Sequence, residues 1–329
     1  MLEIASRILC FVGTPKELAD SVAESLVLAQ QSGHTSHGVM RLIEYVEFVR
    51  KGEVSPAAVP QIVSERGAVI TLNGNWGWGQ IACKKAVELA VEKAKNFGIS
   101  SIAINSCNHI GRLGEYVEML SKQSLVAIMF CNTGASVAPY GGKTRLFGTN
   151  PFAAAIPGSD GDIVIDFATA ASAEGKLRIA HLNGQKIPEG LVISKEGQST
   201  TNPADFYEGG ALLPFGGHKG YCLNLLIELL GGSLSGIHPA MNEAYDHGNG
   251  TVLIAMDPDF FVGVNNFDQD ISEAKHHIKT APAVNDSTPI LLPGEMETNA
   301  IAKNSIEIEV PSIIWQSILE LEKSVSKLI

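Results

Sequence analysis

The sequence predicts an α/β protein with a helical portion at its N-terminus. Two observations predict this fold class. Apolar residues recur at helical spacing within the first seventy residues, and from about residue 67 short apolar runs alternate with helical patterns. A chain of 329 residues is long enough to bury a large core and to form about two domains.

The N-terminal portion is expected to contain two clear helices. Residues 14–17 read as a capping box with Pro15 at the first helical position, and apolar residues follow at helical spacing. A second helix is expected over residues 39–51, because Gly52 follows and cannot easily continue it.

The α/β portion is bounded by changes in pattern. Residues 80–96 carry alanines at spacings of four and end before Gly98, a typical helix stop. Residues 184–216 are rich in glycine and proline and are expected to be mostly loop. Strands are expected at 68–72, 99–105, 125–131, 152–156, 163–168 and 306–310. Helices are expected at 80–96, 112–122, 171–182, 217–230 and from Pro311 onward.

The last of these helices is expected to pack against the N-terminal helical portion. The predicted organisation is therefore a helical domain of residues 1–72 plus 298–329 and an α/β domain of residues 73–297.

Charge and cysteine content limit the partners. The net charge of −11 repels phosphate backbones and argues against a nucleic-acid partner. The five cysteines are scattered and odd in number, which favours free thiols over disulfides or metal ligands. The N-terminus has no basic segment followed by an apolar stretch, and no run approaches the ~18 apolar residues of a membrane span. We therefore expect a cytoplasmic protein with no membrane partner.

The most informative stretch lies where a polar loop leads into the second helix. His37 can exchange a proton near neutral pH, because free imidazole titrates around pH 6.5. Arg41, one helical turn further on, offers a planar fork of N–H donors that fits a carboxylate. A proton donor beside a carboxylate clamp is what an enzyme acting on a small 2-oxo or 2-hydroxy acid requires.

Two nucleotide-binding patterns occur but fail on their context. Residues 77–82 fit the G-x-G-x-x-A dinucleotide fingerprint, but the next strand ends in Asn105 where an acidic residue should bind the ribose. A tight turn of the chain is the alternative explanation for these glycines. Gly142-Lys143-Thr144 is not a phosphate-binding loop, because Val137 stands where its first glycine should be.

A glycine-rich segment at residues 216–220 is the better candidate for a phosphate or ribose site. Its glycines expose backbone N–H groups at an expected helix start, where Lys219 adds positive charge. The alternative interpretation is a surface lysine at a glycine-rich turn, and the residues alone do not favour either.

Other histidines have simpler interpretations. His109 follows a strand, where α/β enzymes place ligand contacts, but a histidine taken alone at such a position is more often a structural group. His34 and His37 could bind a metal with Asp20 or Glu44, but no H-E-x-x-H or carboxylate-rich spacing supports this. No metal site is therefore expected.

Six stretches follow one another along almost the whole chain: Ser36-His37-Gly38-x-x-Arg41-Leu42, Asn108-His109-x-Gly111, Gly148-Thr149-Asn150-Pro151, Asp166-Phe167-Ala168-Thr169 with Gly175-Lys176, Leu213-Pro214-x-Gly216-Gly217-x-Lys219-Gly220-Tyr221, and Pro293-Gly294-Glu295. In this order and spacing they resemble the type-2 malate/L-lactate dehydrogenase family. The resemblance implies a fold distinct from the Rossmann fold, with a mixed sheet and a homodimer whose active site lies between domains and partly between subunits.

The resemblance also implies the site residues. His37 matches the proton-transferring histidine, Arg41 and Tyr45 face the substrate, and His109 lies close to the reacting centre; with Ser36 these form the predicted catalytic set. The residues matched to the cofactor are Asp166, Phe167, Ala168, Thr169, His218, Lys219, Gly294, Glu295 and Met296.

The predicted function is hydride transfer between NAD or NADP and a malate- or lactate-like 2-hydroxy or 2-oxo acid, or a cyclic imino acid. Relatives commonly carry an aspartate near residues 190–194, where this chain has Ser194. If that aspartate orients the catalytic histidine, the chain is a catalytically weak member that binds a nucleotide or metabolite. A metal-dependent lyase or hydrolase is the third alternative.

Overall fold

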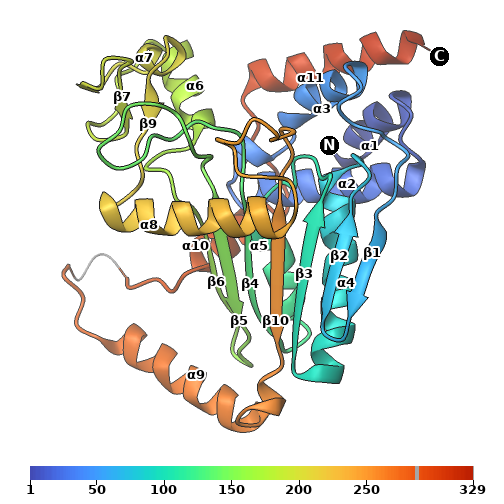
Figure 1. Cartoon of the computed structure of the whole chain (residues 1–329), viewed down its shortest axis with the longest axis vertical. Helices are drawn as coiled ribbons and strands as arrows, with labels where there is room; N and C mark the ends of the chain where they lie inside the picture. Colours follow the sequence, from blue (N-terminus) through green and yellow to red (C-terminus); the bar gives the residue numbers. More distant parts are fainter. Residues whose placement is uncertain (286–288, 329) are drawn as a thin grey trace.

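The computed structural model describes residues 1–285 and 289–328, and a seven-stranded mixed sheet forms its centre (Figure 1). Its strands are β1 Gln61–Arg66, β2 Val69–Asn73, β3 Ile99–Asn105, β4 Val126–Cys131, β5 Pro151–Ile156, β6 Ile163–Ala168 and β10 Thr251–Met256. The order across the sheet is β1-β2-β3-β10-β4-β5-β6. Only β2 and β3 pair in parallel, and all other neighbours are antiparallel, so the predicted mixed sheet is confirmed.

Helices cover both faces of this sheet. On one face lie α4 Gly79–Phe97 and α5 Leu113–Ser121, and on the other lies α8 His218–Ile227 (Figure 1). The spacing of four predicted the helix α4, and its buried alanines allow it to approach β3 closely. Helix α4 ends at Gly98, whose φ of 79° is the left-handed conformation that favours glycine.

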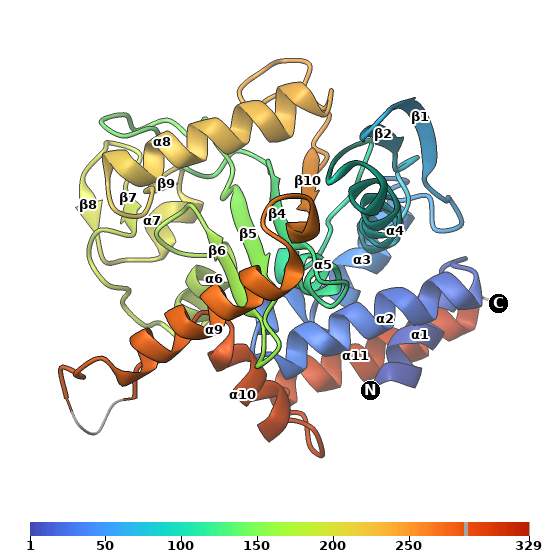
Figure 2. The same cartoon turned by 90° about the horizontal axis from the view of Figure 1, so that it is seen from below.

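A separate helical cluster packs beside the sheet. It consists of α1 Leu2–Phe11, α2 Lys16–Gln31, α3 Arg41–Arg50 and α11 Ser312–Val325, around a core that includes Leu26, Tyr45 and Ile318. Figure 2 shows α1, α2 and α11 side by side. The C-terminal helix therefore packs against the N-terminal ones, as predicted. Strands β1 and β2, at residues 61–73, lie in the sheet, and a domain boundary at residue 72 stays a prediction.

The segment expected to be loop contains short elements. Strands β7 Val192–Ile193, β8 Ser199–Thr200 and β9 Ala211–Leu212 form a three-stranded sheet beside α6 Glu174–Leu182 and α7 Ala204–Tyr207. The remaining elements are α9 Val264–Thr280, α10 Glu295–Lys303, the 3-10 turns η1 Thr35–His37, η3 Pro258–Phe260 and η4 Ser326–Leu328, and the π-helix η2 Glu228–Leu234 that continues α8.

Three predictions about local structure were wrong. Thr14 does not cap α2, because its hydroxyl accepts a hydrogen bond from the Trp78 indole at 3.1 Å and Pro15 is the residue that precedes the helix. Residues 306–310 form no strand, and the Glu309 carbonyl instead accepts a hydrogen bond from the Gln30 amide. Strand β1 was not expected, because it is an edge strand whose side chains are mostly exposed and carry little apolar pattern.

All five cysteines are free thiols, as expected. Cys83, Cys107 and Cys131 are buried, whereas Cys222 is exposed. Within the part of the chain that the structure describes, no helix is both long and apolar enough to cross a membrane.

Candidate active site

A cavity of about 510 Å³ lies where the helical cluster meets the sheet. Three parts of the chain wall it: the η1 turn with the start of α3, the loop after β3, and the end of β6 with the segment that leads to α6. Seven predicted site residues line this one cavity, namely Ser36, His37, Arg41, His109, Asp166, Phe167 and Ala168.

The two histidines stack against each other at the cavity wall. The ring centroids of His37 and His109 are 5.5 Å apart, and the ring planes differ by 19°. Nδ1 of His37 lies 3.1 Å from the Ser36 hydroxyl. Burial, with Arg41 as the next cause, lowers the pKa of His37 to about 3 and that of His109 well below its usual value. Both imidazoles are therefore neutral at pH 7 in the free protein.

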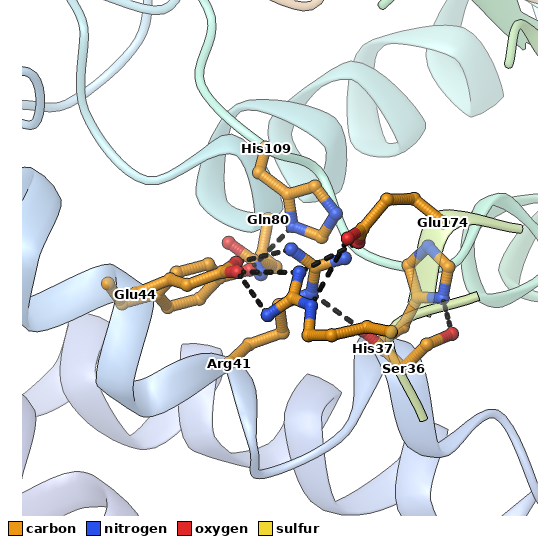
Figure 3. Close-up of polar contacts among 9 residues, drawn as sticks. Ser36, His37, Arg41, Glu44, Gln80, His109 and Glu174 are labelled. Atoms are coloured by element: carbon orange, nitrogen blue, oxygen red, sulfur yellow. Dashed lines mark hydrogen bonds and ion pairs between the residues drawn. The ribbon is translucent and has the colours of Figure 1, made fainter. Parts of the chain in front are cut away.

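The Arg41 side chain is held by contacts with the η1 turn and with its own helix α3 (Figure 3). Its Nε donates to the Ser36 carbonyl at 2.6 Å, and its Nη1 pairs with Glu44. Glu44 is in turn held by Arg178 of α6, whose Nη1 lies 3.2 Å from Glu44 Oε1. Nη2 of Arg41 makes no hydrogen bond to the described chain, so one donor at the cavity remains for a ligand.

Tyr45 does not line the cavity, although it was predicted to face the substrate. Its side chain is buried in the helical cluster, and its hydroxyl lies 2.8 Å from His109 Nδ1. The hydroxyl also accepts a hydrogen bond of 2.6 Å from the amide of Gln80, at the start of α4. Tyr45 thus contacts the cavity only through His109.

Asp166 is the acidic residue at the end of the predicted cofactor strand. Its Oδ2 accepts a hydrogen bond of 2.8 Å from the backbone N–H of Gly114. Burial raises the pKa of Asp166, although the nearby Arg112 guanidinium and this hydrogen bond act in the opposite direction. Arg112 is itself buried and pairs with Glu118 at 2.7 Å.

The other residues matched to a cofactor lie outside the cavity. Thr169 is buried, and its hydroxyl donates to the carbonyls of Thr149 and Asn150. His218 and Lys219 open α8, which begins at the positive-φ Gly217. Gly294, Glu295 and Met296 stand at the start of α10, where Glu295 pairs with Lys279 at 2.6 Å and the Met296 side chain is exposed.

Position 194 lies away from the histidines. Ser194 sits in the turn between β7 and β8, and its hydroxyl contacts Glu196 at 3.0 Å. It does not line the cavity, and the side chain beside His37 Nδ1 is Ser36. In this chain, therefore, the residue at position 194 does not orient His37.

The alternative metal ligands are engaged elsewhere. His34 pairs with Glu297 at 3.2 Å, and Asp20 binds Ser6 and Lys16. Among residues 1–285 and 289–328, no three His, Cys, Asp or Glu side chains gather as a metal site would require.

The sequence alone did not point to Gln80, although the neighbouring Gly79 belongs to the G-x-G pattern of residues 77–79. A Cβ on Gly79 would lie 2.4 Å from the carbonyl oxygen of Asn108 and 2.5 Å from that of His109. Glycine is therefore required for α4 to begin directly against the loop that carries His109. The G-x-G pattern of residues 77–79 thus serves helix packing at the site and brings the Gln80 side chain under Tyr45.

Comparison with known proteins identifies the family. Residues 1–319 match the family described as malate/L-lactate dehydrogenase. The chain belongs to the malate/L-lactate dehydrogenase family. L-Sulfolactate dehydrogenase of Methanocaldococcus jannaschii is 37% identical over 314 residues, which cover 94% of this chain and 91% of that protein. Hydroxycarboxylate dehydrogenase B of Escherichia coli K12 is 35% identical over 327 residues, or 95% and 90% of the two chains.

Solved structures of the malate/L-lactate dehydrogenase family share the fold. The structure of sulfolactate dehydrogenase from Methanocaldococcus jannaschii matches with a TM-score of 0.90 at 34% identity, covering 99% of this chain and 95% of that one. The expected fold class is thereby confirmed. These relatives are named as dehydrogenases of hydroxy acids, so the chain belongs to a family of hydroxy-acid dehydrogenases.

Proposed function

We propose that this protein interconverts a small 2-hydroxy acid and its 2-oxo acid with NAD or NADP, with His37 as the acid/base and Arg41 as the carboxylate clamp. The observation that carries the proposal is that both side chains line one cavity, and that neither Nε2 of His37 nor Nη2 of Arg41 hydrogen-bonds to any residue that the structure describes. A malate- or lactate-like acid is the proposed substrate, and a cyclic imino acid would present the same carboxylate.

The residues of the cavity fit a nicotinamide. Residues 168–173 supply mostly alanine to its wall, so a flat ring would meet little steric obstruction there. A volume of about 510 Å³ is within the range of small-molecule sites. Asp166, Phe167 and Ala168 would hold the cofactor here, and the family resemblance assigns the remainder of it to Thr169, His218, Lys219, Gly294, Glu295 and Met296. When bound, the nicotinamide supplies or accepts the hydride.

The chain's own groups would then hold the substrate and move one proton. Arg41 fixes the carboxylate, which holds the substrate carbon C2 in one position. In oxidation, neutral His37 takes the hydroxyl proton; in reduction, protonated His37 gives a proton to the forming alkoxide. Burial is the main cause of the lowered pKa of His37, and the positive charge of Arg41 is the next. A substrate carboxylate at Arg41 would offset that charge, so we expect binding of the oxo acid to raise the pKa of His37.

The pH dependence should differ between the two directions. Because the pKa of His37 is lowered to about 3, the neutral base persists down to that pH, and kcat/KM for the hydroxy acid should stay level from pH 8 to about pH 5. Reduction needs the rare protonated form, so kcat/KM for the oxo acid should fall about tenfold for each unit by which the pH rises from 5 to 8. Initial rates in both directions measure this. A level profile for reduction would show that His37 is not the acid.

The first experiment is a screen of malate, lactate, sulfolactate and ureidoglycolate with NAD and NADP, followed at the nicotinamide absorbance. Turnover of one of them supports an enzyme. Tight binding of cofactor without turnover of any acid would favour the metabolite-binding alternative, and activity that depends on metal and is lost to a chelator would favour a lyase or hydrolase.

We also propose a homodimer, as the family resemblance implies. An apolar stripe on α8 and η2 supports it: the side chains of Leu226, Leu229 and Leu234 are 52%, 45% and 61% exposed. Light scattering should give about twice the mass of the chain, and Leu226→Glu with Leu229→Glu should shift it toward the single chain. A monomer at micromolar concentration would contradict the proposal.

The proposed compartment is the cytoplasm. The free thiols of Cys83, Cys107 and Cys131 support a reducing environment. A helical domain of residues 1–72 plus 298–329 and a nicotinamide-binding domain of residues 73–297 remain the proposed division of the chain.

A further inference from the structure

Gln80, Tyr45 and His109 form a short line of hydrogen bonds behind the cavity (Figure 3). Only His109 of the three lines the cavity, and its Nε2 makes no hydrogen bond to the described chain. Gln80 and Tyr45 are both buried. The positions of the hydrogens in this line are therefore set by which of its atoms can donate and which can accept, and not by water.

The Gln80 amide is oriented with its Nε2 toward Tyr45, and its Oε1 is buried without a hydrogen-bond partner among the described residues. With the amide in this orientation, only one arrangement of hydrogens pairs all three atoms of the line. The amide Nε2 of Gln80 can only donate, so it approaches Tyr45 Oη at 2.6 Å with one of its hydrogens. Tyr45 Oη then has its own hydrogen to place, and its only other hydrogen-bond partner among the described residues is His109 Nδ1 at 2.8 Å. If Nδ1 also carried a hydrogen, the phenol hydrogen would be buried without an acceptor, which is unfavourable.

We propose that Gln80 is a positioning residue that sets the direction of the Tyr45 hydroxyl and so holds His109 as the tautomer with its hydrogen on Nε2. His109 then presents one N–H donor to the cavity and no lone pair. This inference rests on the proposed function in one respect only, namely that the donor would meet the substrate oxygen whose proton His37 transfers.

The arrangement gives the two stacked histidines different tasks. His37 Nδ1 faces a serine hydroxyl, which can donate or accept, so its proton state is free to change. His109 Nδ1 faces a hydroxyl whose hydrogen is already directed at it. A neutral imidazole of fixed tautomer can stabilise negative charge on a substrate oxygen without giving up its proton. Burial supports this state, because it keeps His109 neutral and the Tyr45 phenol protonated by raising its pKa.

The decisive measurement is the tautomer of His109 by nitrogen NMR of protein with labelled histidine, assigned through the signal that disappears in His109→Asn. The proposal predicts a protonated Nε2 and an unprotonated, hydrogen-bonded Nδ1 from pH 6 to 8. A hydrogen on Nδ1 overturns it, because the Gln80 amide would then present its oxygen to Tyr45 and leave Nε2 of His109 as an acceptor.

A substitution tests whether Gln80 is the cause. Gln80→Glu keeps the shape but, once ionised, only accepts, so Tyr45 should turn its hydrogen toward position 80 and His109 should move its own hydrogen to Nδ1. The spectrum is read at a pH where a carbon-13 label shows the new carboxyl ionised. A wild-type tautomer beside an ionised carboxylate overturns the proposal. Gln123→Glu, on the exposed turn after α5, is the matched control and should leave the tautomer unchanged.

Kinetics separate this inference from the proposed function. In Gln80→Glu, where Nε2 of His109 would present a lone pair to the cavity and not an N–H, kcat should fall about 10²-fold while KM for the acid changes little. The NMR result stands whether or not any acid is turned over, so a wrong tautomer contradicts the role of Gln80 alone. Failure of His37 and Arg41 to affect turnover contradicts the proposed function alone.

Discussion

Replacement of His37 by alanine is expected to lower kcat by about 10²–10⁴-fold in both directions, the usual contribution of a positioned acid or base. Of the two stacked imidazoles, that of His37 is the one whose proton state can change, because His109 is held by the Tyr45 hydroxyl. Affinity for the cofactor should change little, since His37 lies in η1, on the wall formed with the start of α3, and not in the segment 166–168 where we propose that the cofactor binds. Steady-state kinetics and a cofactor titration measure the two effects.

A matched control is available on α9. His277 is exposed and lies outside the cavity, so His277→Ala should keep the wild-type kcat. If His37→Ala turns over within a few-fold of the wild type, the proton comes from another group and the assignment of His37 is wrong.

Arg41→Lys is expected to raise KM for the acid by about 10–100-fold, with a smaller effect on kcat. Lysine keeps the positive charge but loses the planar fork, and with it the Nε bond to the Ser36 carbonyl that orients the guanidinium. Hydrogen bonds to charged groups contribute roughly 1.5–3 kcal/mol each, and this sets the expected range. Substrate titrations at saturating cofactor give the result.

Arg50→Lys is the control for this change. It lies at the end of the same helix α3, pairs with Glu47 at 3.0 Å, and does not line the cavity. Its KM should match the wild type. Wild-type KM in Arg41→Lys as well would mean that the carboxylate is bound by another cation.

Elements with clear ends were predictable from the sequence. Strand β3 was predicted with its observed bounds, because Gly98 stops the preceding helix and a polar loop follows Asn105. Strand β10, at the middle of the sheet, was not predicted. Five of its six residues, 252–256, form an uninterrupted apolar run, and periodicity cannot distinguish such a run from a buried helical segment.

The site residues also divide into those that the sequence could place together and those that it could not. His37 and Arg41 are four residues apart, so local spacing was enough to place them together. The contact of Tyr45 with His109 spans 64 positions and that with Gln80 spans 35, and only the packing of α4 and α3 brings these side chains together. Local spacing carries no information on such contacts, which is why Gln80 was missed. The expectation that Tyr45 faces the substrate came from the family resemblance, and spacing could not show its contact with His109.

The most direct test of the account is a crystal structure of the protein with a nicotinamide cofactor and oxalate, which resembles a 2-oxo acid but cannot be reduced. We expect the nicotinamide ring in the cavity beside residues 166–168, with the oxalate between that ring and His37 and one of its carboxylates bound by Arg41 Nη2. A ring bound elsewhere, remote from both His37 and Arg41, would contradict the proposed chemistry.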